Sequence, residues 1–234
     1  MLPVTPEETR FRSQKPGFSP RFYEVWSHYN CGLMDDCRIL LIGGTSHVGK
    51  STLAQSLAAQ LGWSYLSTDR LMRHPGRPWQ VPPQTVPQHV ADHYQTLSVD
   101  ELVADVHRHY RENVWPLIEN IVTTRVEDLS TDRLVLEGSA ILPECIVTLP
   151  YKNTAAIWLS ASREFLSQRI NAESQYAAKS PPEKALIDKF LQRTWQYNDL
   201  MLEEVKRLRL ASLVVDDASH LDELIAACRA VIGQ

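Results

Sequence analysis

The chain has 234 residues, which is enough for one α/β domain that buries a full core without metal ions or disulfides. Its formal net charge is −4, and this mildly acidic balance argues against wholesale binding to a nucleic-acid backbone. No apolar run reaches the roughly eighteen residues of a membrane helix, and the N-terminal segment lacks the apolar core of a signal peptide. We therefore expect a cytoplasmic protein, monomeric or homodimeric, that binds neither nucleic acid nor membrane.

The cysteines and histidines form no recognisable metal motif. No two of the four cysteines have the spacing of a structural zinc pair, so we expect reduced, mostly buried thiols at Cys31, Cys37, Cys145 and Cys228. His89 and His93 have helical spacing and could form half of a metal site, but no glutamate follows the first of them as in a zinc protease. We predict no metal site from these histidines.

The first part of the chain differs from the rest. Residues 1–37 are rich in proline, aromatic and charged residues and show no sustained periodicity, although 19–30 could form a short helix. We interpret 1–37 as an accessory arm and place the compact domain at 38–234.

The domain begins with a strand, a helix and a second strand. A continuous apolar run at 38–43 predicts a strand that is buried on both faces. Helical spacing of leucines and a terminal glycine predict a helix at 50–62, and 63–69 is a second strand. A long loop rich in proline, arginine and histidine follows, from 70 to about 89.

The second half of the domain repeats this alternation. Ser98 and Glu101 form a capping box that predicts the start of a helix, and Pro116 should kink or restart it. Strands are predicted at 133–138, 154–160 and 211–217, with a helical segment at 162–209 that is interrupted at 180–182 and a closing helix at 220–232. Five strands that alternate with helices indicate a three-layer α/β/α fold with an open parallel sheet, in which ligands bind at the carboxyl ends of the strands.

The stretch GGTSHVGKST joins the first strand to the first helix. Gly44, Gly49, Lys50 and Ser51 match the phosphate-loop pattern G-x-x-x-x-G-K-[ST] in full. Backbone N–H groups of such a loop surround the phosphates of a nucleotide, and the helix N-terminus adds partial positive charge. We predict a nucleoside triphosphate site formed by Gly44, Thr45, Ser46, His47, Val48, Gly49, Lys50, Ser51 and Thr52, and the loop leaves the choice between ATP and GTP open.

Individual roles follow from the chemistry of this loop. Lys50 should reach the β- and γ-phosphates, Ser51 should ligate Mg²⁺, and Thr52 can hydrogen-bond an inner phosphate. His47 has no assigned role, since it can fill the bend of the loop or touch an acceptor.

Acidic residues end two of the other strands. Asp69 ends the second strand, where its carboxylate could accept a proton from an attacking hydroxyl or orient the metal, or could only cap the following segment. Glu137 ends the third strand and is predicted to hold Mg²⁺ together with Ser51, through water. Gly138 would leave the backbone open to substrate.

Two basic segments are candidates for contacts with a second substrate and with the phosphates. Arg70, Arg73 and Arg77 could hold an anionic substrate from a substrate loop at 70–97, or could be solvated loop residues. In a lid region at 163–209, Arg169 and Arg193 are predicted catalytic residues that would neutralise the transferring phosphoryl group.

On these residues the chain resembles the small-molecule P-loop kinases. These adenylate-kinase-like proteins include shikimate and gluconate kinases, chloramphenicol phosphotransferase, the zeta-toxin kinases and 2-phosphoglycerate kinase. The resemblance covers about 38–234 and implies a sheet of order 2-3-1-4-5, a mobile lid, and transfer of the γ-phosphoryl group of ATP to a small acceptor. By position, Lys50 and Ser51 match the phosphate and metal residues, and Asp69 matches the acidic residue that in several members activates the acceptor hydroxyl. The lid lacks an Arg-x-x-x-Arg pair, and the arm before Arg38 is extra.

Two classes of function fit these features. The first is an ATP- and Mg²⁺-dependent phosphotransferase that acts on a hydroxyl of a small, anionic metabolite. The second is a nucleotide-gated regulatory protein without a small-molecule acceptor. A nucleic-acid end kinase is disfavoured by the acidic net charge.

Overall fold

The computed structural model describes residues 37–72, 74–80, 84–150 and 153–234. The predicted arm up to residue 36, with its helix at 19–30 and Cys31, lies outside these residues, and so does Arg73. None of the described helices is both long and apolar enough to span a bilayer.

Five parallel strands form one sheet at the centre of the described chain. In sheet order these are β2 (Ser64–Ser67), β3 (Leu134–Glu137), β1 (Ile39–Gly44), β4 (Thr154–Ala161) and β5 (Ser212–Val215). The predicted five-stranded sheet and its order 2-3-1-4-5 are confirmed. The register pairs Ile42 of β1 with Glu137 of β3, so the acidic strand end lies beside the start of the phosphate loop.

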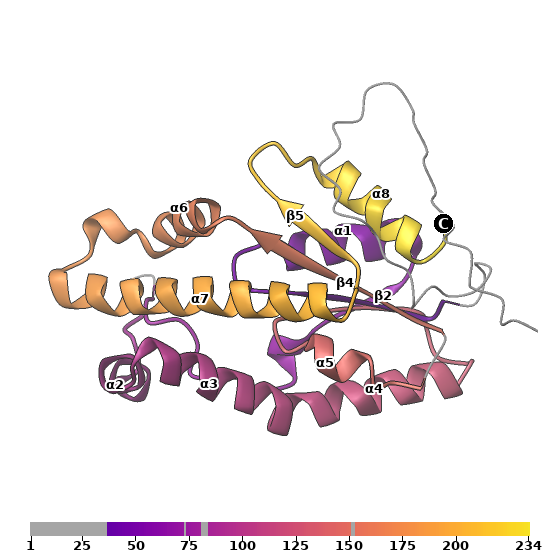
Figure 1. Ribbon diagram of the computed structural model, residues 1–234, viewed down its shortest axis with the longest axis horizontal. Helices are drawn as coiled ribbons and strands as arrows, with labels where there is room; N and C mark the ends of the chain where they lie inside the picture. The colour runs from indigo at the N-terminus through magenta and orange to yellow at the C-terminus, as the bar shows by residue number, and fades with distance from the viewer. Residues whose placement is uncertain (1–36, 73, 81–83, 151–152) are drawn as a thin grey trace, which may run out of the picture.

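Helices cover both faces of the sheet (Figure 1). The helices are α1 (Lys50–Leu61), α2 (Gln88–Thr96), α3 (Val99–His109), α4 (Trp115–Glu127), α5 (Pro143–Ile146), α6 (Arg163–Ser174), α7 (Pro181–Arg207) and α8 (Leu221–Val231). Side chains alternate along β1: Leu40 and Ile42 belong to the core under α1 and α8, while Ile39 and Leu41 belong to the core under α4 and α7. Because both faces are covered, the three central strands are mostly apolar.

The predicted helix signals hold. Ser98 and Glu101 form the capping box of α3, in which the Ser98 amide donates to Glu101 at 2.7 Å. Pro116 lies in the first turn of α4, after a π-helical turn at Tyr110–Val114, so the long helix restarts there. The interruption in the basic segment is also present, because α6 and α7 are separated by a short turn at Tyr176–Ala178.

Two helices are absent from the sequence-based assignment. α2 lies inside 70–97, which was predicted as loop, and α5 follows β3 where no element was expected. α2 buries only Val90 and Tyr94, and its other positions are polar except for Ala91, so its one-turn apolar spacing is too short to stand out.

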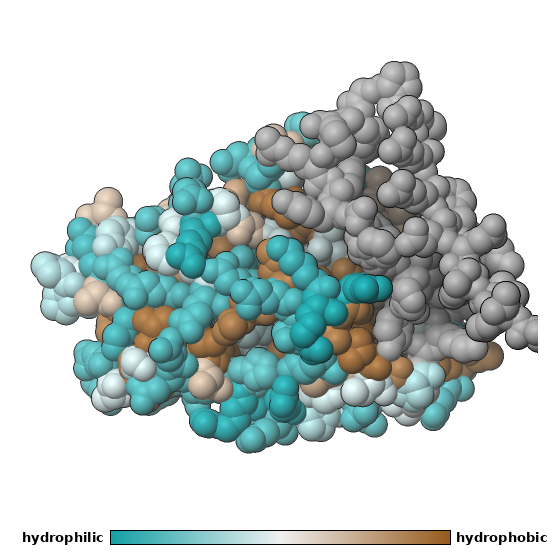
Figure 2. Space-filling view, in the orientation of Figure 1, coloured by the Kyte–Doolittle hydropathy of each residue, from teal (hydrophilic) through white to brown (hydrophobic). Residues whose placement is uncertain are grey.

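A third apolar cluster lies beyond the sheet. It joins the 74–80 loop to α2, α3, α6 and α7 through Trp79, Val90, Tyr94, Leu102, Ile170, Ile187, Phe190 and Leu191. In Figure 1 these elements gather at the end toward which the strand arrows point. Figure 2 shows mostly hydrophilic residues on this face, with small hydrophobic areas along and below α7. The loop and the predicted lid therefore share one packed unit at the carboxyl edge of the sheet.

Candidate active site

The phosphate loop turns sharply between β1 and α1. Three of its residues have positive φ: Gly44 at 141°, His47 at 66° and Gly49 at 104°. Glycine adopts such angles without steric cost, whereas a histidine in the left-handed region is held there by its surroundings. Gly49 is the N-cap of α1, so the loop delivers the N-terminus of a twelve-residue helix to the cavity.

Lys50 is buried at the start of this helix. Its Nζ donates to the carbonyl oxygen of Thr45 at 2.7 Å and to Ser139 Oγ at 3.3 Å. Burial lowers the pKa of Lys50, while the carboxylates of Glu137 and Asp69 act in the opposite direction. The ammonium group thus has two neighbouring carboxylates that favour its charged form.

Ser51, Glu137 and Tyr65 form a compact group beside Lys50. The Ser51 hydroxyl donates to Glu137 Oε1 at 3.0 Å, and the Tyr65 hydroxyl donates to the same oxygen at 3.0 Å. Glu137 is 2% exposed, so both hydrogen bonds act on a desolvated carboxylate. Serine and carboxylate oxygens are the ligands that Mg²⁺ prefers, and the two predicted metal residues are within hydrogen-bonding distance of each other. This donor set fits a magnesium ion.

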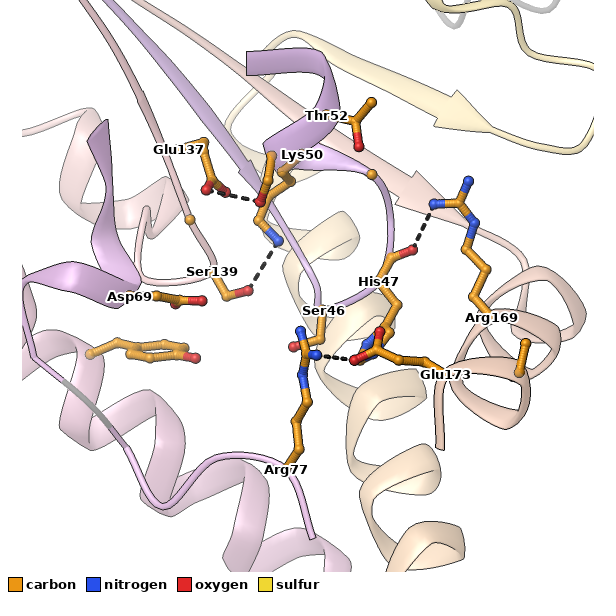
Figure 3. Close-up of a pocket in the computed structure, with 15 residues that line it drawn as sticks. Ser46, His47, Lys50, Thr52, Asp69, Arg77, Glu137, Ser139, Arg169 and Glu173 are labelled. Carbon is orange, nitrogen blue, oxygen red and sulfur yellow. Dashed lines mark hydrogen bonds and ion pairs between the residues drawn. The ribbon is translucent and has the colours of Figure 1, made fainter. Parts of the chain in front are cut away.

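A cavity of about 490 Å³ extends from the phosphate loop. Its lining residues are Ser46, His47, Gly49, Lys50, Ser51, Thr52, Asp69, Arg77, Tyr110, Glu137, Gly138, Ser139, Arg169, Ala172 and Glu173. Figure 3 shows Lys50 and Arg77 entering from opposite directions, with Asp69 and Ser139 along one side and Arg169 along another. The cavity therefore continues past the phosphate loop into a space bordered by further polar side chains.

Asp69 lies in a short turn, Thr68–Arg70, that follows β2. The cap of this turn is Ser67, whose hydroxyl oxygen accepts from the Asp69 amide at 3.4 Å. The alternative that Asp69 serves as the cap is therefore wrong, and its side chain lines the cavity instead. This turn can lie against the end of β3 only because residue 138 is glycine, since a Cβ there would lie 1.7 Å from Thr68 Oγ1.

The opposite wall is made by Arg77, Glu173 and His47. The Arg77 guanidinium forms an ion pair with Glu173, and His47 Nε2 lies 3.0 Å from the other oxygen of that carboxylate. The His47 ring packs against Trp79 and Phe190, each with ring centroids 5.8 Å away. Burial, with help from the charges of Arg77 and Lys50, lowers the pKa of His47 to about 3. His47 is therefore a neutral filler of the loop bend at physiological pH.

The two predicted lid arginines differ in position. Arg169 of α6 lines the cavity and donates to the backbone carbonyl of His47 at 3.2 Å. Arg193 of α7 is buried outside the lining, where it donates to the Tyr94 hydroxyl at 2.7 Å and stacks on Phe190. The middle of α7 packs against α2, and this packing turns Arg193 toward the third apolar cluster.

Other predicted residues also lie off the cavity. Arg70 is exposed and does not line it, unlike its loop neighbour Arg77. Three residues of the phosphate loop also lie outside the cavity lining: Gly44, Thr45 and Val48. The Thr45 hydroxyl donates to the Thr194 carbonyl at 3.3 Å, and Val48 is fully buried in the core. In a tight loop some side chains point into the core and others toward the ligand. Fewer residues therefore line the cavity than the continuous motif 44–52 predicts.

Sequence reasoning missed Tyr65, Tyr110 and Glu173. Tyr65 lies on a strand that was recognised, and its hydrogen bond to Glu137 depends on the pairing of β2 with β3. Tyr110 begins the π-helical turn before Pro116, a type of irregularity that is common at functional sites. Glu173 is one of several acidic residues on polar helix faces, and no local signal marks it.

The sheet order and the complete phosphate loop together define the α/β/α fold of P-loop nucleotide-binding proteins. No protein-family model and no curated protein matches the sequence. Among solved structures, a gluconokinase from Sinorhizobium meliloti 1021 has a TM-score of 0.47 and 18% identity over 84% of this chain and 92% of its own. A sugar kinase from Janibacter sp. HTCC2649 has a TM-score of 0.46 and 14% identity over 84% of this chain and 94% of its own. A shikimate kinase from Aquifex aeolicus vf5 has a TM-score of 0.44 and 11% identity over 83% of this chain and 95% of its own. At these scores the likeness describes general shape and says nothing about what this chain binds.

Proposed function

We propose that this protein is an ATP- and Mg²⁺-dependent phosphotransferase that moves the γ-phosphoryl group to a hydroxyl of a small, anionic metabolite. The observation that carries the proposal is that one cavity is lined both by the phosphate loop and by Asp69, Ser139 and Arg77. A protein that only binds or hydrolyses a nucleotide needs the loop, whereas the groups opposite it suit a second substrate.

The phosphates of ATP would be held by the loop amides and the N-terminus of α1. Lys50 would neutralise charge on the β- and γ-phosphates, and Arg169, beside Gly49, would add positive charge from α6. Ser51 and Glu137 would hold Mg²⁺, which when bound neutralises phosphate charge and orients the phosphate chain.

The acceptor would lie between Asp69 and Arg77. Its hydroxyl oxygen bonds to the γ-phosphorus while the bond from that phosphorus to the β–γ bridging oxygen breaks, and ADP leaves. The hydroxyl proton passes to the Asp69 carboxylate, which acts as general base. Arg77 offers a planar pair of donors to a carboxylate or phosphate of the acceptor, and this is the support for an anionic substrate.

The test is a screen of acceptors with γ-labelled ATP. The panel contains hydroxy acids, phosphorylated alcohols and neutral sugars, and each is assayed with wild type, Asp69→Asn and Arg77→Gln. Arg70→Gln is the matched control, because Arg70 lies in the same loop outside the cavity.

We expect acceptor-stimulated turnover that falls about 100-fold or more in Asp69→Asn. Arg77→Gln should raise KM for anionic acceptors, while Arg70→Gln should leave it unchanged. Turnover that survives Asp69→Asn unaltered would remove Asp69 from the mechanism. Slow hydrolysis that no acceptor stimulates would favour the nucleotide-gated regulatory protein instead.

A further inference from the structure

A cluster of two histidines and one aspartate lies between the 74–80 loop, α2 and α3. It consists of His74, His93 and Asp105, one from each of these elements. Asp105 Oδ2 is 3.0 Å from His74 Nε2 and 3.9 Å from His93 Nε2, and the three atoms all lie within 4.8 Å of one another. Three potential ligand atoms thus converge from segments that are separate in the chain.

The histidine nitrogens are available as ligands. The His74 side chain is 8% exposed, and His93 Nε2 is buried without a hydrogen-bond partner among the described residues. Burial lowers the pKa of His74 to about 4 and also lowers that of His93, with the charge of Arg193 acting in the same direction. Both rings are therefore neutral at physiological pH, the state in which imidazole binds a metal.

The Asp105 carboxylate also has one oxygen directed at the two histidines. Arg108 pairs with Asp105 Oδ1 and leaves Oδ2 to face the two histidines. A hydrogen bond to the second oxygen of a ligating carboxylate is the usual outer support of a metal site. A simple hydrogen-bonded His–Asp pair accounts for His74 but leaves His93 Nε2 buried and unpaired, which is costly.

We propose that His74, His93 and Asp105 bind a divalent transition-metal ion, and the two imidazoles with one carboxylate favour Zn²⁺. Ligand atoms around a tetrahedral Zn²⁺ ion at about 2.05 Å lie roughly 3.3 Å apart. Two of the observed separations, 3.0 and 3.9 Å, bracket this value, and the third, between the two histidines, is at most 4.8 Å, so the ligand atoms lie near the spacing that a bound ion requires. The His109 ring, with its centroid 5.2 Å from that of His74, lies next to the cluster on the α3 side.

The ion would join the loop to two helices. His74 precedes Arg77 in the loop that lines the large cavity, so coordination at His74 would hold the Arg77 backbone in place. This metal site lies outside the cavity lining and is separate from the Mg²⁺ site at Ser51 and Glu137. Its existence does not depend on the proposed phosphotransferase activity.

Cobalt(II) is a suitable probe, because tetrahedral Co²⁺ has intense visible bands that octahedral Co²⁺ lacks. Metal-free wild type is titrated with Co²⁺ in the absence of nucleotide, and Zn²⁺ is then added to displace it. The variants are His93→Ala and Asp105→Asn, and His89→Ala is the control, since His89 is exposed on the same helix as His93.

We expect wild type and His89→Ala to bind one equivalent of Co²⁺ with visible bands that Zn²⁺ abolishes. His93→Ala and Asp105→Asn should lose these bands while they keep the far-UV spectrum of wild type. Zn²⁺ at a hundred times its Kd should raise the unfolding midpoint of wild type by roughly 5 to 11 °C and leave both variants unchanged. Absence of the bands in wild type, or their retention in both variants, would overturn the proposal.

Discussion

Replacement of His47 by asparagine should reduce the loss of stability that acid causes. The His47 side chain is 4% exposed, and its pKa is lowered to about 3 from 6.5 by burial and the neighbouring cations. The folded protein therefore keeps His47 neutral between pH 8 and pH 5, whereas the unfolded chain takes up a proton there. Because the unfolded state binds more protons, this residue's contribution is complete above pH 6.5 and is lost as pH falls toward 3.

The size of this loss follows from the two pKa values. At pH 5 the unfolded histidine lies 1.5 pH units below 6.5, and at 1.36 kcal/mol per unit its protonation favours the unfolded state by about 2 kcal/mol. Any folded-state pKa below about 4 gives the same result, since the folded form is then neutral at pH 5. Asparagine is chosen because it tolerates the left-handed backbone at φ 66° better than most residues.

Urea unfolding at pH 8 and pH 5 measures this contribution. The drop in unfolding free energy from pH 8 to pH 5 should be about 2 kcal/mol smaller in His47→Asn than in wild type. His89→Asn, at an exposed position, should match wild type and so controls for the loss of a histidine as such. Equal drops in His47→Asn and wild type would refute the inference that His47 is buried in its neutral form.

Three further substitutions test the site. Lys50→Met keeps the buried stem but removes the ammonium, and turnover of ATP should fall at least about 100-fold; a smaller change would contradict its role at the phosphates. Tyr65→Phe removes one of the two hydroxyls that donate to Glu137, so the Mg²⁺ concentration needed for half-maximal nucleotide binding should rise about tenfold, as measured by titration at fixed nucleotide. Gly138→Ala places a Cβ 1.7 Å from Thr68 Oγ1 and should lower the urea unfolding free energy by about 2 kcal/mol, and wild-type stability would refute this packing.

The fold was predictable because its signals are local. Each strand that is buried on both faces is a continuous apolar run, and each long helix has a cap or a proline at its boundary. α2 was not predictable in this way, because only Val90 and Tyr94 mark its buried side. Its position is determined by the third apolar cluster, which unites residues from five separate segments.

The site was predictable mainly in the phosphate loop and at strand ends, and two predicted arginines of the basic segments, Arg77 and Arg169, also line the cavity. Asp69 and Glu137 lie just past a strand and at a strand end, and Ser51 lies in the motif that joins β1 to α1; parallel strands bring these positions to one edge. Glu173 reaches the cavity from a helix, and the face that it occupies depends on how α6 packs on α7. Arg193 lies on the predicted lid helix but does not line the cavity, because Tyr94 and Phe190 bury its side chain in the third apolar cluster.

In the ion pair between Arg77 and Glu173, the Glu173 carboxylate occupies part of the guanidinium that an anionic ligand would bind. An anion that binds the Arg77 guanidinium competes with a tethered carboxylate, so its apparent affinity is lowered by at most the free energy of that pair. The pair is weak, because both side chains are roughly half exposed, at 50% and 42%. Displacement also frees the Glu173 carboxylate from the 74–80 loop, while the buried contacts of the third apolar cluster still hold that loop against α6, so an anion can enter without separating these two walls.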